Sequence, residues 1–135
     1  MSQRPWRESF DITGASHGNT PIPAGTRVGN IVFSSGIKGG DPATGKLPAD
    51  ASEQVRYAFL NMDALLHASG ADLGDVGRVT VFLADLALRE HVNREWLARF
   101  PDPKNRPARH TLVEDLRGGM QVQLEIFAVV RERNS

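Results

Sequence analysis

Two charged side chains in the C-terminal part of the sequence are suited to act on a small substrate. Arg109 stands in residues 106–111, at the start of a predicted strand. Its guanidinium group can hold a carboxylate through two parallel hydrogen bonds, which predicts a carboxylate anchor. Glu125 stands among apolar residues in 121–127, where a carboxylate needs a partner. We interpret it as a general acid or base beside a substrate. The alternatives are a surface arginine and a glutamate paired at the rim.

A tight turn would bring these two side chains together. Residues 118–119 are both glycine and indicate a turn between the last two predicted strands. A hairpin at this turn would place Glu125 near Thr111 and Leu112 on the facing strand. Arg109 would then lie a few residues away, within reach of a shared ligand.

Common metal and cofactor motifs are absent from the sequence. It contains no cysteine, which excludes Cys-ligated zinc and a thiol nucleophile. The Gly-rich stretch 34–40 lacks the spacing of a phosphate-binding loop, and no G-x-S-x-G elbow is present. We therefore expect neither a metal nor a cofactor. The four histidines lack metal-ligand spacing; they are His17, His67, His91 and His110.

Length and charge narrow the class of protein. A chain of 135 residues suits one domain, expected over 1–135. The 16 basic and 16 acidic residues balance, whereas a dedicated nucleic-acid binder usually carries a basic excess. Residues 1–10 carry charge throughout and lack the apolar core of a signal peptide. No stretch approaches the roughly 18 apolar residues of a membrane helix. We expect a cytoplasmic protein without a nucleic-acid or membrane partner.

Hydrophobic periodicity predicts two amphipathic helices. The first runs from about 51 to 69, with Asp50 as N-cap and Glu53 completing a capping box. Gly70 suits the left-handed position after its last turn. The second helix runs from about 86 to 99. Its predicted apolar stripe contains Leu88, Val92, Trp96 and Leu97.

Short apolar or alternating runs predict the strands, at residues 8–12, 27–34, 79–83, 108–113 and 122–130. The order of elements predicts an α+β fold, in which both helices cover one face of a mixed sheet. Phe127 and Val129 leave the other face partly apolar. A symmetric homo-oligomer is the simplest arrangement that buries it.

Short motifs recur in a fixed order from about residue 27 to residue 131. They are residues 27–36 with a Ser-Gly turn, Gln54, Asn61, the turn 70–76, the strand 79–86, Asn93, Pro107-Ala108-Arg109 and Val122-Gln123-Leu124-Glu125. In this order and spacing they resemble the Rid family, also called YjgF and often labelled endoribonuclease L-PSP. The resemblance implies a chorismate-mutase-like α+β fold. It also implies a homotrimer around a central barrel of sheets, with active sites between subunits.

The resemblance also implies a reaction. Deaminases of the family hydrolyse reactive enamines and imines, such as 2-aminoacrylate and its imine tautomer, to 2-oxo acids and ammonia, without metal or cofactor. By this resemblance Arg109 binds the substrate carboxylate, helped by backbone groups of Gly36 and Thr111. Glu125 positions the attacking water and moves protons, and Asn93 forms a wall of the site.

The sequence departs from the family pattern at several positions. Ile22 stands where the deaminases usually have a tyrosine, so that hydroxyl group is lost. His17, in the preceding loop, could supply a polar group instead. Gln123 replaces a family acid. His110 stands where many members have a small residue, and strand alternation predicts that it points away from Arg109.

Three functions remain open on the sequence alone. The first is an enamine or imine deaminase, including a pathway-specific form for a larger unsaturated amino acid such as 2-aminomuconate. The second is a non-catalytic module that binds a small carboxylate. The third is a ribonuclease, which the sequence does not support because it shows no paired histidines, basic track or acidic metal cluster.

Overall fold

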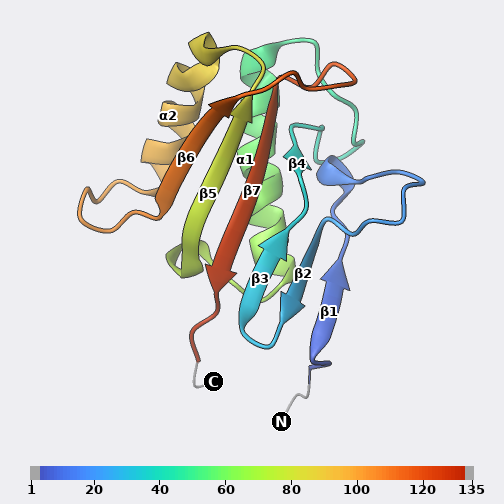
Figure 1. Cartoon of the computed structure of the whole chain (residues 1–135), viewed down its shortest axis with the longest axis vertical. Helices are drawn as coiled ribbons and strands as arrows, with labels where there is room; N and C mark the ends of the chain where they lie inside the picture. The colour runs from blue at the N-terminus through green and yellow to red at the C-terminus, as the bar shows by residue number, and fades with distance from the viewer. Residues whose placement is uncertain (1–3, 133–135) are drawn as a thin grey trace.

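A computed structural model describes residues 4–132, and in this part of the chain seven strands form one mixed sheet (Figure 1). They are β1 (Arg7–Phe10), β2 (Gly25–Val28), β3 (Ile31–Ser34), β4 (Ile37–Lys38), β5 (Val76–Leu83), β6 (Ala108–Val113) and β7 (Val122–Val129). The spatial order is β1-β2-β3-β7-β5-β6, and β4 pairs with β7. Neighbouring strands are antiparallel except β5 and β6, which are parallel. The predicted mixed sheet is confirmed.

Two helices, α1 (Ala51–Ala68) and α2 (Arg89–Arg99), lie on one face of this sheet, as predicted (Figure 1). Asp50 caps α1 by accepting a hydrogen bond from the Ser52 amide. Such a cap stabilises a helix by about 1 kcal/mol. Gly70 follows the helix with a φ of +82°, a conformation that glycine adopts without strain. Both ends of α1 therefore agree with the sequence prediction.

The second helix begins a few residues later than the sequence predicted. Residues Leu86–Leu88 form a 3₁₀ turn that leads into α2. Val92 and Trp96 are buried as predicted, but Leu97 is 52% exposed. Successive residues of a helix point about 100° apart, so Trp96 and Leu97 do not share one buried stripe. The prediction for Leu97 was wrong for this reason.

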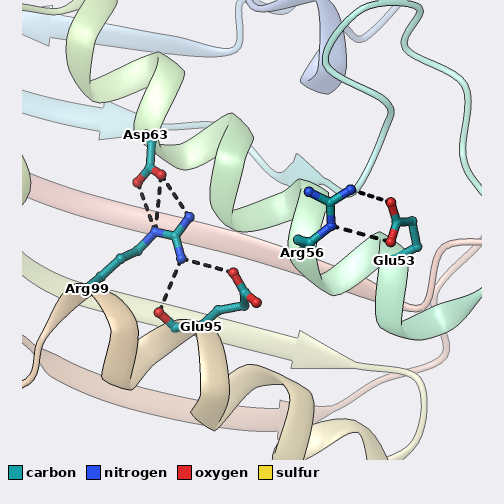
Figure 2. A network of polar contacts seen from close by, with 5 residues as sticks. All are labelled: Glu53, Arg56, Asp63, Glu95 and Arg99. Carbon is teal, nitrogen blue, oxygen red and sulfur yellow. Dashed lines mark hydrogen bonds and ion pairs between the residues drawn. The ribbon is translucent and has the colours of Figure 1, made fainter.

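Arg99 joins the two helices (Figure 2). Its guanidinium group, 11% exposed, donates hydrogen bonds to both carboxylate oxygens of Asp63 on α1 and to Glu95 on α2. Burial, the largest single influence, lowers the pKa of Arg99, but the hydrogen bonds and charges of Asp63 and Glu95 together outweigh it and raise the pKa above its ordinary value. Figure 2 also shows Glu53 paired with Arg56, so the capping box predicted for Glu53 gives way to an ion pair within the helix.

The predicted strand over 27–34 is two strands, β2 and β3, joined by a tight turn. Gly29 and Asn30 form the turn between the paired residues Val28 and Ile31. Gly29 has a φ of +60°, the sign that a type II′ hairpin turn requires at its first central position. The single-strand prediction was wrong because the apolar residues on both sides of this turn read as one run.

The hairpin predicted between β6 and β7 is also wrong. β5 lies between these strands and pairs with both of them. The chain passes through α2 after β5, and β6 then runs parallel to β5 at the sheet edge. Such a helical crossover is the usual connection between parallel strands. Residues 114–121 then cross the end of β5 to begin β7 (Figure 1).

The two faces of the sheet differ because the helices cover only one of them. The face beneath the helices forms the core, and alternate residues of β7 point into it as predicted: Val122, Leu124, Ile126 and Ala128. No helix of the part of the chain that the structure describes lies over the other face (Figure 1). Four large apolar side chains lie exposed there, on two paired strands: Ile31, Phe33, Phe127 and Val129. We call these four residues the outer apolar patch.

Candidate active site

Arg109 lies on the edge strand β6 and is partly covered by α2. In the sheet it pairs with buried Val79, so its side chain points to the helix face. Its Nε donates a hydrogen bond to Thr111 Oγ1 at 3.1 Å. Its guanidinium carbon lies 5.3 Å from the centre of the Trp96 ring. These contacts hold the guanidinium in place, and it forms no ion pair with any residue between 4 and 132.

A second arginine raises the positive charge around Arg109. Burial lowers the pKa of Arg109, and the charge of Arg89 at the start of α2 lowers it further. An arginine remains protonated in proteins even so. Asn93 and Trp96 follow Arg89 at helical spacings of four and seven residues, so all three share one face of α2. We call Arg89, Asn93, Trp96, Arg109 and Thr111 the arginine cluster. It holds two cations and no acid, which suits an anionic ligand.

Gly36 and His17 meet at a different place, in a cavity of about 430 Å³. The glycine is needed there because a Cβ at position 36 would lie 2.2 Å from the Gln123 amide nitrogen. Sequence reasoning singled out Gly36 and His17 but missed Lys38, which the pairing of β4 with β7 places opposite Gln123. We call this space the glycine cavity. Its lining residues are Ser16, His17, Gly18, Gly36, Lys38, Met120 and Gln123.

Glu125 lies next to the glycine cavity on β7 without lining it. β7 pairs with β4 through residues 123–124 and with β3 through 127–129. Glu125 therefore faces the break between those strands, which contains Ser35 and Gly36. The side chain is half-buried, on the face opposite the core. Gln123, two residues before Glu125 on β7, lines the cavity instead. Its side-chain amide cannot carry a proton as a carboxylate can.

Arg109 and Glu125 point to opposite faces of the sheet within one chain. Arg109 shares a register row with Val79 and Ile126, which are buried beneath the helices. Glu125 shares a row with Thr80 and His110 on the other face. The prediction that His110 points away from Arg109 is confirmed. A joint role of Arg109 and Glu125 stays a prediction, and it requires a second copy of the chain.

Ile22 and His17 line a neighbouring cavity of about 440 Å³, formed by residues 11–23. Ile22 is 43% exposed and does not line the glycine cavity. His17 lines both cavities, and its Nε2 is sealed from solvent without a hydrogen-bond partner. His17 therefore borders both the cavity that contains Ile22, at the family's tyrosine position, and the cavity that contains Gly36.

Two buried amides of α1 hold the backbone around the glycine cavity. Asn61 Nδ2 donates to the carbonyls of Lys38 and Gly40 at 3.0 and 2.9 Å. Gln54 donates to the carbonyl of Gly119 at 3.1 Å and accepts from the Gln121 amide at 2.9 Å. Their side chains therefore fix β4, which carries Lys38, and the loop that leads into β7, on which Gln123 lies. Both amides stood among the sequence motifs that resemble the Rid family.

Replacing Asn61 with alanine should destabilise the fold by about 2–4 kcal/mol, because the buried Gly40 carbonyl and the partly buried Lys38 carbonyl lose their donor and a cavity remains. Urea unfolding followed by circular dichroism measures this change. Asn105→Ala, at an exposed asparagine of the 101–107 loop, is the matched control and should change stability by less than about 0.5 kcal/mol. Equal effects of the two substitutions would contradict the role given to Asn61.

The described residues show neither a membrane span nor a metal cluster. Within residues 4–132 no helix is long and apolar enough to cross a membrane. In the same range no three His, Asp or Glu side chains are grouped so that they could hold a metal ion.

The fold defines an α+β protein whose single mixed sheet is covered on one face by two helices. A family model described as Endoribonuclease L-PSP matches residues 19–130. The chain belongs to this family, which is the Rid, or YjgF, family that its motifs resemble.

Curated relatives carry deaminase names. The 2-iminobutanoate/2-iminopropanoate deaminase of Escherichia coli (strain K12) is 33% identical over 113 residues, which are 84% of this chain and 88% of that protein. Reactive Intermediate Deaminase A, chloroplastic, of Arabidopsis thaliana is 37% identical over 112 residues, which are 82% of this chain and 59% of that protein.

Solved structures share the fold over nearly their whole length. The crystal structure of the YjgF gene product of E. coli has a TM-score of 0.80 and 30% identity, covering 92% of this chain and 99% of that chain. RidA from the Antarctic bacterium Psychrobacter sp. has a TM-score of 0.80 and 29% identity, covering 91% and 99%. These similarities confirm the predicted α+β architecture.

Proposed function

We propose that this protein hydrolyses reactive 2-imino acids and their enamine tautomers to 2-oxo acids and ammonia. The observation that carries the proposal is the guanidinium of Arg109, which is held by Thr111 and Trp96 and has no acidic partner among the described residues. A substrate carboxylate would supply that partner. The deaminase names of the relatives support the reaction type.

The reaction needs little beyond orientation and a proton carrier. Water adds to the electrophilic C=N carbon, the C–N bond breaks, and ammonia leaves while the carbon becomes a carbonyl. No oxidation occurs, so water is the only co-reactant. Arg109 would hold the carboxylate, with backbone groups of Gly36 and Thr111 beside it. Glu125 would position the water and move protons, a contribution of about 10²–10⁴-fold, and Asn93 would close one wall.

We propose a homotrimer with active sites between subunits. The outer apolar patch supports an assembly, because exposed apolar surface of this kind marks an interaction site. The opposite directions of Arg109 and Glu125 support a site shared by two copies. We also propose a cytoplasmic location, which a sequence without cysteine suits.

Ammonia release from freshly generated 2-iminopropanoate tests the proposed function. The wild-type protein should accelerate formation of the 2-oxo acid and ammonia well above the spontaneous rate. An inactive wild-type protein that still binds a 2-oxo acid would overturn the deaminase proposal.

The second candidate is a module that binds a small carboxylate without turnover. Two observations favour it: Gln123 stands in the glycine cavity, and Ile22 replaces a tyrosine. Binding of 2-oxobutanoate without any deaminase activity is the result that it predicts. The same two measurements therefore separate the two candidates.

Restoring the hydroxyl at position 22 should raise activity. Ile22→Tyr places a phenol beside His17, in the cavity next to Gly36, and we expect kcat/KM for 2-iminopropanoate to rise by about tenfold. The gain should come from the hydroxyl group and its hydrogen bond. Ile22→Phe, which adds the ring alone, is the matched control. An equal gain from both substitutions would assign the effect to ring packing.

A further inference from the structure

Lys38 places an unpaired positive charge in the wall of the glycine cavity. It is half-buried on β4, opposite Gln123 in the sheet. Its ammonium group forms no ion pair with any of the residues 4–132. The chain keeps this charge in a cavity rather than at the open surface, where Lys46 and Lys104 lie.

The walls of the glycine cavity suit an anion. Among the described residues that line it, Lys38 is the one cation, and no Asp or Glu is present. His17 adds an imidazole, and Ser16 and Gln123 add polar groups. A hollow lined by charge of one sign concentrates ligands of the opposite sign. Asn61 holds the Lys38 carbonyl at 3.0 Å, so the backbone that carries the charge is fixed.

We propose that Lys38 binds a second anionic group of the substrate, so that this protein acts on 2-imino acids whose side chain ends in a carboxylate. The inference rests on the proposed function, in which Arg109 of a neighbouring copy holds the first carboxylate. The cavity, at about 430 Å³, lies within the size range of small-molecule sites and has room for a longer side chain. Lys38 takes no part in making or breaking covalent bonds. It determines only which substrates bind well.

Two measurements on the full-length protein test this inference. The first is calorimetric binding of 2-oxoglutarate and of 2-oxobutanoate, which are stable products with and without a second carboxylate. The second is kcat/KM for the freshly generated imines of glutamate and of 2-aminobutanoate. Each uses the wild type, Lys38→Met and the control Lys46→Met, at an exposed lysine outside the cavity.

We expect the wild type to prefer the dicarboxylate in both measurements. Lys38→Met should reduce that preference by about ten- to hundredfold, the range of a charge-assisted contact, while Lys46→Met keeps it. A wild type that turns over both imines without preference, or equal effects of the two variants, would overturn the inference and leave the deaminase proposal standing. Loss of dicarboxylate binding in Lys38→Met, with no turnover by any form, would support the anion site and overturn the deaminase proposal.

Discussion

Arg109→Ala should lower kcat/KM for 2-iminopropanoate by about 10²–10³-fold. The substitution removes the guanidinium that we expect to orient the substrate carboxylate, and small errors of orientation have effects of this size. Arg109→Lys keeps the charge but loses the planar fork that Thr111 and Trp96 hold in place. We expect it to remain at least tenfold below the wild type. Initial rates of ammonia release measure both changes.

Arg94→Ala is the control for this experiment, because Arg94 is exposed on the same helix as Trp96. It should leave the rate within about twofold of the wild type. Thermal unfolding of each variant shows whether a lost rate reflects a lost fold. A folded Arg109→Ala protein with more than half of the wild-type activity would refute the carboxylate anchor.

Phe127→Lys should have two effects at once: it should separate the subunits, and it should abolish activity. Phe127 is 49% exposed and packs edge to face on Phe33, with ring centres 5.4 Å apart, in the outer apolar patch. A lysine buried at that surface costs several kcal/mol when it has no partner. Since Arg109 and Glu125 point to opposite faces, a separated chain would lack a complete site. We expect a folded monomer with at least hundredfold lower activity.

Light scattering at micromolar concentration measures the assembly, and circular dichroism measures the fold. Leu97→Lys, at a leucine 52% exposed on the helix layer, is the matched control and should stay trimeric and active. A stable wild-type monomer would contradict both the trimer and the shared site. A monomeric Phe127→Lys protein with wild-type activity would leave the trimer possible but refute a site between subunits.

The elements that the sequence predicted well depend on local signals. The first helix has its cap at Asp50 and its end at Gly70, and both act within one turn. The alternation of residues in β7 follows from the two-residue repeat of a strand, whatever its neighbours are. The predicted strand over 108–113 has the bounds of β6 for the same reason.

The error that moved the site residues apart arose where distant segments pair. The glycines at 118–119 indicate a turn, but they do not say which strand lies beside β7, and β5 takes that place. Pairing over long separations depends on how the whole sheet buries its strands, which short-range patterns do not contain. Lys38 was missed for the same reason, since its significance comes from Gln123 across the sheet.

The sequence by itself determined the first helix, the presence of the second, the inward face of β7 and the family motif that contains Arg109, because each depends on neighbouring residues. Only the tertiary structure decided that Arg109 lies against α2 while Glu125 points to the other face. It also decided that Gly36, His17 and Lys38 share a cavity. Side-chain direction across a sheet follows the register between strands, and that register forms only when the whole chain packs.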